Sequence, residues 1–220
     1  MVLRLRHYRG ESLSSCASID VLRLFSSHAH EKHNSNERQN ENRKCLTLDV
    51  LEAIKKRRSI RSYLDTPVEQ EKIDQILEAA RLSPSAVNFQ PWAFIVVKDP
   101  ACKERLIAAY SRSWFAKAPV IIVTCATPDK AWKRSDGEEF WKIDAAIAHQ
   151  NLILEATALG LGTCWIGAFD EAKAKEALGI PANVRVVAMT PLGYAAEHPT
   201  QASDRKATEE IVHHDKWQNA

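Results

Sequence analysis

Hydrophobic and polar positions follow a helical pattern from Leu48 onward. Leu48, Leu51 and Ile54 fall on one helical face with Val50 beside them, and the four cations from Lys55 to Arg58 follow directly. Cations stabilise the C-terminal end of a helix because that end carries the negative pole of the helix dipole. The pattern therefore predicts a first helix that starts near Leu48 and ends in this basic run.

A second amphipathic pattern predicts a helix that ends before Ser83-Pro84, because the residue preceding a proline avoids the helical region. Its apolar positions point inward as a set: Ile73, Ile76, Leu77 and Ala80. Its start carries a capping box with proline at the first helical position, formed by Thr66, Pro67 and Glu69.

The rest of the chain alternates strand and helix signals. Four short apolar runs are predicted as strands: Trp92 to Val97, Val120 to Cys125, Thr163 to Ile166 and Val184 to Thr190. Three helices are predicted, one beginning at Asp99-Pro100, one over Phe140 to Leu159 and one between Asp170 and Gly179. The segment 140–159 is apolar on nearly every side, so we expect it in the core or in a subunit interface. This order of elements predicts an α+β layered domain.

The first 45 residues lack such a pattern. The stretch from His30 to Lys44 contains no aliphatic or aromatic residue, which favours disorder. Glu11 and Asp20 argue against an organellar transit peptide. We predict that residues 1–45 are a disordered or mis-annotated extension and that 46–220 form the functional domain. N-terminal sequencing that finds a native start close to Leu48 would support this.

Composition narrows the class of protein. The chain has 220 residues, 45% hydrophobic and 26% charged, with 30 Lys plus Arg against 28 Asp plus Glu. A net charge of +2 lacks the electrostatic signature of a nucleic-acid binder. The apolar runs are shorter than the about 20 residues that span a bilayer. Scattered cysteines without a C-x-x-C pair predict a reducing, cytoplasmic location and no metal: Cys16, Cys45, Cys102, Cys125 and Cys164.

The first candidate for chemistry is the run Arg57-Arg58-Ser59-Ile60-Arg61, where a helix passes into an extended segment. Three guanidinium groups and a hydroxyl lie within five residues. Such a group can bind a phosphate monoester, because each planar guanidinium donates two parallel hydrogen bonds to anionic oxygens. The alternative is a solvated basic helix end.

Three further segments could contribute to a binding site. The turn from Ser83 to Trp92 presents hydroxyls, amides and backbone N–H groups, although these are also ordinary turn residues. Cys164-Trp165-Ile166-Gly167 ends a predicted strand with a glycine that lets a flat ligand approach the backbone. Arg205-Lys206 could be a second phosphate clamp or a solvated charge pair. No Gly-x-Gly-x-x-Gly motif occurs, so a Rossmann site has no support.

Together, these segments resemble the nitroreductase family of FMN enzymes over roughly Leu46 to Trp217. The motifs that carry the resemblance are Arg-Arg-Ser-x-Arg, Pro-Ser-x-x-Asn-x-Gln-Pro-Trp, the helix start at Asp144 to Asn151 and the strand end at Pro191 to Tyr194. The resemblance implies a mixed central β-sheet flanked by helices. It also implies a homodimer that binds FMN at its interface.

The resemblance also implies roles for individual residues. Arg57, Arg58, Ser59 and Arg61 would lie along the FMN phosphate and ribityl chain. Pro84, Ser85, Asn88 and Gln90 would reach FMN from the second subunit. Ile166 and Gly167 would face the flavin near N5, and Arg205 with Lys206 would close around the phosphate. Ala207 stands where the family often has proline, so the resemblance does not fix which tail residue binds the phosphate.

The activity that the resemblance implies is a two-step hydride transfer. NADH or NADPH would reduce FMN at N5, and a nitroaromatic, quinone or similar small electron-poor acceptor would then take the hydride. We assign no acid or base, and we interpret Cys164 and His149 as a buried thiol and a satisfied histidine. The segment Ser111 to Glu139, with Trp114, Phe115 and Trp132, is expected to be a loop over the flavin that selects the acceptor.

Other functions stay open at this point. Relatives on the same flavin scaffold carry out reductive dehalogenation, enoyl-type reduction or flavin fragmentation, and a fold does not fix a substrate. A non-catalytic FMN-binding module is a second alternative. A nucleic-acid module is a third, which a salt-dependent gel shift would reveal.

Overall fold

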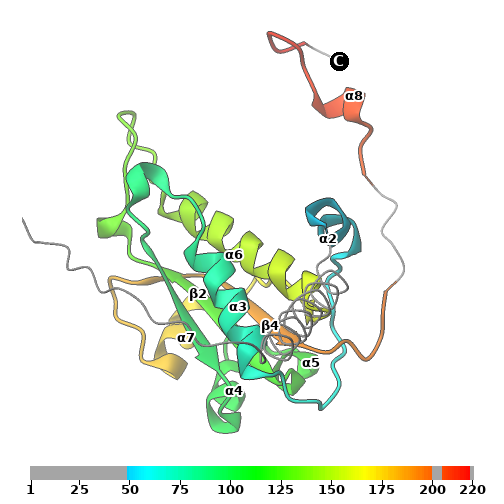
Figure 1. The fold of residues 1–220 in the computed structure, drawn as a ribbon. Coiled ribbons are helices and arrows are strands. Elements are labelled where there is room, and N and C mark those ends of the chain that lie inside the picture. Colours follow the sequence, from blue (N-terminus) through cyan, green and yellow to red (C-terminus); the bar gives the residue numbers. More distant parts are fainter. Residues whose placement is uncertain (1–48, 200–204, 219–220) are drawn as a thin grey trace, which may run out of the picture. The chain divides into compact units, whose positions relative to one another are not determined.

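The computed structural model describes residues 49–199 and 205–218 (Figure 1). The predicted extension 1–45 lies outside these residues, as does Leu48 at the predicted start of the first helix. Every helix in the described part of the chain is too short or too polar to cross a membrane.

A four-stranded sheet forms the middle layer of the domain, with strand order β1-β2-β4-β3. The strands are β1 (Trp92–Val97), β2 (Val120–Ala126), β3 (Gly162–Thr163) and β4 (Arg185–Gly193). Each strand is antiparallel to its neighbour. Ser59 adds a parallel bridge to Thr163, so the predicted mixed sheet is correct through this one bridge.

Helices cover both faces of the sheet. Successive side chains of β2 point to opposite faces, and those on each face pack in a separate hydrophobic core. Val120 and Ile122 pack with α3 (Gln70–Arg81) and α6 (Trp141–Ala158). Ile121 and Val123 pack on the other face. That face is covered by α4 (Pro100–Leu106), α5 (Ser113–Lys117) and α7 (Glu171–Leu178). Figure 1 shows α3 and α6 crossing the sheet together. The α+β layered domain is confirmed.

The long helix α6 connects the sheet to the outer surface. Its bounds agree with the predicted segment 140–159. The side toward the sheet carries His149, which is fully buried (0% exposed) between two threonine hydroxyls. The His149 nitrogens lie 2.7 Å from Thr124 Oγ1 and 2.6 Å from Thr190 Oγ1. On the outer side, Ile143 and Ile147 are 41% and 36% exposed, although both are apolar.

The remaining helices are short. Helix α2 covers Val50–Lys56, α8 covers Thr208–Ile211, and two 3-10 turns span Ala86–Asn88 and Pro128–Lys130. The predicted starts at Asp99-Pro100 and Asp170 are confirmed, since both aspartates accept a hydrogen bond from a backbone N–H of the first turn.

The predicted start of the second helix is wrong. Helix α3 begins at Gln70, with Glu69 at its N-cap and no side-chain cap. Thr66 and Pro67 precede it in an extended stretch. The Glu69 carboxylate instead accepts the hydroxyl of Tyr194 at 2.8 Å, a contact distant in sequence that no local motif predicts.

Two other predictions differ from the structure. The predicted strand Thr163 to Ile166 is interrupted, since β3 ends at Thr163 and Ile166 forms only an isolated bridge with Met189. The segment Ser111 to Glu139 is not one loop, because β2 runs through it and Phe115 is fully buried in the core. Phe115 belongs to the core and Trp114 packs against it, so the apolar character of this part of the segment reflects core packing.

Candidate functional site

The basic run leaves α2 at Arg57 and continues as an extended segment against the sheet. The Ile60 N–H donates to Thr163 O at 2.8 Å, and Ser59 bridges Thr163. Side chains of an extended segment alternate between two sides. The run is therefore divided, with Arg57, Ser59 and Arg61 on one side and Arg58 and Ile60 on the other.

The first side faces Cys164. Burial raises the pKa of the Cys164 thiol, and the charge of Arg61, hydrogen bonding by the Ser59 side chain and the charge of Arg57 oppose this rise. All three side chains therefore act on the same buried sulfur. They lie close enough to Cys164, the first residue of the segment 164–167, to affect its pKa. This side has the positive charge and the hydroxyl that a phosphorylated ligand requires.

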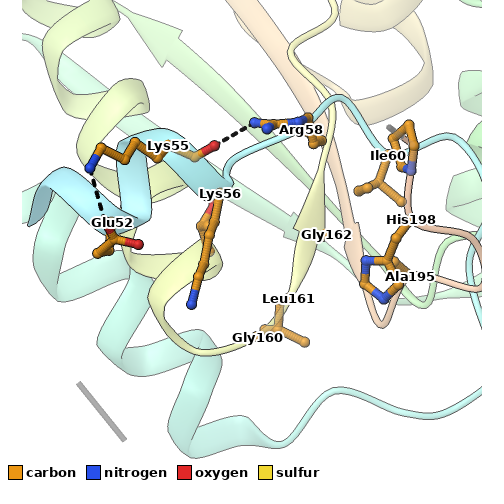
Figure 2. A pocket seen from close by; sticks show the side chains of 12 residues that line it. Glu52, Lys55, Lys56, Arg58, Ile60, Gly160, Leu161, Gly162, Ala195 and His198 are labelled. Carbon is orange, nitrogen blue, oxygen red and sulfur yellow. Dashed lines mark hydrogen bonds and ion pairs between the residues drawn. The ribbon is translucent and has the colours of Figure 1, made fainter. Parts of the chain in front are cut away.

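The second side lines a separate cavity of about 550 Å³ (Figure 2). Arg58 turns back toward α2, where its Nη1 donates to Lys55 O and to Arg57 O, both at 2.6 Å. Lys56 and Ile60 line the same cavity. The structure thus separates Arg58 from the other members of the predicted cluster. Its guanidinium supports the turn at the end of α2.

A glycine in β3 sets how closely the basic segment approaches the sheet. A Cβ atom at Gly162 would meet Ile60 Cγ1 at 2.7 Å and Ile60 Cβ at 2.9 Å. Both distances are shorter than van der Waals contact allows, and Ile60 is itself buried. Only a glycine at position 162 lets the segment 57–61 lie where it does.

We expect Gly162→Ala to displace this segment and to lower the free energy of unfolding by about 1–3 kcal/mol, the usual effect of overpacking. Urea unfolding of the apoprotein measures this loss. Gly167→Ala is the matched control for stability, since its Cβ would meet only Trp165 Nε1 at 3.9 Å. Equal stability of both variants would contradict the proposed close contact.

The turn after β3 presents open backbone next to the cationic side. Ile166 is buried, and its N–H and carbonyl are both bonded to Met189 at 2.9 and 3.1 Å. Gly167 is exposed and has almost no neighbouring atoms at its Cα. Of the two predicted residues, Gly167 therefore offers the accessible surface, while Ile166 fixes the turn to β4.

The loop between α3 and β1 is strained. Val87, Asn88 and Gln90 have φ angles of 54°, 59° and 49°, a region that favours glycine. Ser85 Oγ accepts the Gln90 N–H at 2.9 Å, and the Gln90 amide donates to Asn88 Oδ1 at 3.1 Å. Pro84 is exposed at the start of this turn. Strained backbone of this kind is concentrated at functional sites.

The loop and the basic segment are not joined within one chain. Among the described residues, Ser85, Asn88 and Gln90 make their hydrogen bonds within their own loop, and none reaches the segment 57–61. The hydrogen bonds of the described residues therefore do not bring the two predicted halves of the site together.

The tail residues Arg205 and Lys206 begin the segment 205–218, which is described by itself. Both are exposed, and the following Ala207 N–H donates to the Glu210 carboxylate at 2.7 Å. Their closure around a phosphate stays a prediction.

Sequence reasoning missed one residue of the site and gave another no role. Tyr63 follows the basic segment, and its hydroxyl donates to Ile60 O at 2.8 Å, which ties the segment down. Asp144 is buried on α6, and its Oδ1 accepts the Ala86 N–H of the strained loop at 3.0 Å. The signal for Asp144 was a carboxylate within an otherwise apolar helix. No cluster of metal-binding side chains occurs in residues 49–199 or 205–218.

Comparison with known proteins gives consistent matches. A profile of the Nitroreductase family matches residues 54–114 and 107–194. A protein of Methanothermobacter thermautotrophicus, provisionally named an NADH dehydrogenase/NAD(P)H nitroreductase, is 40% identical over 179 residues, covering 79% of this chain and 91% of the relative. A Bacillus subtilis protein named FMN reductase [NAD(P)H] is 31% identical, and the match covers 76% of this chain and 73% of the relative. An FMN-dependent nitroreductase from Clostridium difficile R20291, whose structure is solved, is 35% identical in sequence. The two structures superpose with a TM-score of 0.63, over 75% of this chain and 98% of that chain.

Proposed function

The chain belongs to the nitroreductase family of NAD(P)H-dependent flavin oxidoreductases, and on this premise we propose that it reduces small electron-poor acceptors, such as nitroaromatics or quinones, in two hydride-transfer steps. The cofactor is FMN and the reductant is NADH or NADPH. The observation that carries the proposal is the gathering of Arg57, Ser59 and Arg61 beside Cys164, on the side that leads to Gly167.

The residues present fit FMN in charge and in shape. Two guanidinium groups and a hydroxyl on one side of an extended segment suit a phosphate monoester. The open backbone at Gly167 suits a flat ring, because a side chain there would occupy the approach. When bound, FMN supplies the hydride chemistry.

The protein's contribution is to hold and orient the cofactor. Arg57 and Arg61 would bind the phosphate, and the Ser59 hydroxyl would donate to it or to the ribityl chain. Arg205 and Lys206 would add charge from the tail. Ile166 would hold the turn in place, so that the Gly167 N–H lies at the ring edge. Preorganised donors of this kind stabilise negative charge on a reduced ring.

We further propose that the functional unit is a homodimer. The apolar side chains that are exposed in the described part of one chain include Val50, Leu51 and Ile54 of α2, Ile143 and Ile147 of α6, and Val87 and Phe89 of the strained loop. Exposed apolar surface of this extent marks an interface, and a two-fold axis would bury the same residues twice. The dimer would place Pro84, Ser85, Asn88 and Gln90 of one copy against the basic segment of the other.

Placing a charge on α6 tests the dimer. We expect Ile147→Asp to weaken dimerisation at least about 100-fold, because each interface would bury an unpaired carboxylate. FMN retention should fall with it. Sedimentation at several protein concentrations measures the first effect, and flavin absorbance of the purified protein measures the second. Ala172→Asp, on the exposed side of α7, is the control. A monomeric variant that keeps one FMN per chain would contradict the placement of the loop.

Anaerobic flavin spectroscopy tests the activity. The purified protein should be yellow, should lose its flavin absorption on addition of NADH or NADPH, and should regain it when a nitroaromatic or quinone is added. Yellow protein that resists reduction would support a binding module. Reduction followed by no turnover with either acceptor class would favour another chemistry on the same scaffold. Colourless protein that does not take up FMN would refute the proposal.

A further inference from the structure

Two side chains of α6 hold the strained loop that follows α3. Three of its non-glycine residues have positive φ, and the surrounding structure must offset the cost of this conformation. Asp144 Oδ1 accepts the Ala86 N–H at 3.0 Å, in the middle of the loop. Asn151 Nδ2 donates to Ser83 Oγ at 2.8 Å, at its start.

The two anchors act from the same side of the helix. Asp144 and Asn151 are seven residues apart, which is close to two turns, so both side chains project in one direction. The loop is thus fixed to α6 at two points, and the Thr127 N–H fixes its end by donating to Pro91 O at 2.9 Å. Of these anchors, only Asp144 reaches the turn that contains the strained residues.

The burial of Asp144 lowers the stability of the folded protein. Its side chain is only 2% exposed, and Oδ2 has no hydrogen-bond partner. A buried acceptor without a partner lowers the stability of the folded state, and native proteins seldom leave one. This carboxylate therefore contributes to the conformation of the loop that it holds, and not to the stability of α6.

Among the described residues, the conformation that Asp144 holds leaves the Ser85 hydroxyl and the Asn88 side-chain amide able to donate to a ligand. Ser85 Oγ uses a lone pair to accept the Gln90 N–H, so the hydroxyl proton remains available. Asn88 Oδ1 accepts the Gln90 amide, so its own Nδ2 donors remain available. An O–H and an amide N–H from one short loop match the carbonyl oxygens and ring nitrogen along the pyrimidine edge of an isoalloxazine.

We infer that Asp144 is a positioning residue, which sets the strained loop so that Ser85 and Asn88 meet the polar edge of the flavin. This inference rests on the proposed function. It gives a role to a buried carboxylate that touches neither the cofactor nor the acceptor.

Two substitutions of Asp144 separate its hydrogen bond from its charge. Asp144→Ala removes the acceptor of the Ala86 N–H, and we expect hydrogen exchange of that amide in the apoprotein to rise and FMN binding to weaken, each about 10- to 100-fold. Asp144→Asn keeps Oδ1, so both values should return to within about threefold of the parent chain, as expected where one acceptor oxygen suffices. Lys142→Ala, exposed on the same helix, controls for substitution on α6.

The two measurements make failure informative. Faster exchange with unchanged FMN affinity in Asp144→Ala would overturn the positioning role and leave flavin binding intact. Unchanged exchange, or no recovery in Asp144→Asn, would also overturn it. If the parent chain itself failed to bind FMN, the proposed function would fall together with this inference.

Discussion

Replacing Arg57 and Arg61 together by alanine is expected to weaken FMN binding about 100- to 10,000-fold, since each of the two charged hydrogen bonds to a phosphate contributes about 1.5–3 kcal/mol. The fold should persist, because among residues 49–199 and 205–218 the Arg61 guanidinium makes a single hydrogen bond, to Ser59 O at 3.4 Å. The loss should appear in FMN affinity, and turnover at saturating FMN should recover in part.

The control for this double variant removes the same charge from the other side of the segment. Lys55 and Lys56 line the cavity opposite the proposed flavin side. Their double alanine variant should bind FMN within about threefold of the parent chain, as screened surface charges contribute little. Titration of each apoprotein with FMN, followed by flavin fluorescence, measures both. Equal losses in the two double variants would mean that net charge, and not the side of the segment, determines binding.

Most elements of the fold could be predicted because their signals are local. The caps at Asp99 and Asp170 and the terminator Gly179 lie within one turn of the helices that they delimit. The alternation in β2 likewise shows in the sequence which residues face each core. By contrast, the hydrogen bond from Tyr194 to Glu69, the N-cap residue of α3, joins residues 125 positions apart. Contacts at that separation leave no mark in a local pattern.

The candidate site could be predicted in its residue types but only partly in its geometry. The period of an extended chain would have separated Arg58 from Arg57, Ser59 and Arg61. The cations at 55–58 obscure this period, because as a group they also fit the C-terminal end of a helix. The strain at Val87 had no signal, since valine seldom adopts a positive φ. The orphan oxygen of Asp144 required three-dimensional packing to be recognised.

The largest expected loss of stability follows from replacing His149 by leucine. Leucine fills a similar volume, but it leaves the hydroxyls of Thr124 and Thr190 buried without their partner, and both residues are 0% exposed. Each unpaired hydroxyl costs about 1–3 kcal/mol, so we expect the free energy of unfolding to fall by about 2–5 kcal/mol at pH 7.5. His149→Gln, whose amide both donates and accepts, should lose less. A leucine variant as stable as the parent chain would show that these hydrogen bonds contribute nothing.

The same substitution should also remove part of the pH dependence of stability. Burial lowers the pKa of His149 from 6.5 to about 3, so between these values the unfolded chain binds a proton that the folded chain does not. The stability linked to this group is complete above pH 6.5 and falls as the pH decreases toward 3, by about 1.4 kcal/mol per pH unit. The difference in the free energy of unfolding between the parent chain and His149→Leu should therefore narrow by about 1.4 kcal/mol from pH 7.5 to pH 5.5. Urea unfolding of the apoproteins at both pH values tests this.

His214→Leu, which removes an exposed imidazole, is the control and should leave the pH dependence of stability unchanged. A constant difference would mean that the folded and unfolded chains bind the His149 proton equally, and a difference that widened at pH 5.5 would mean that His149 is protonated in the folded protein, with both ring nitrogens donating to the threonine hydroxyls.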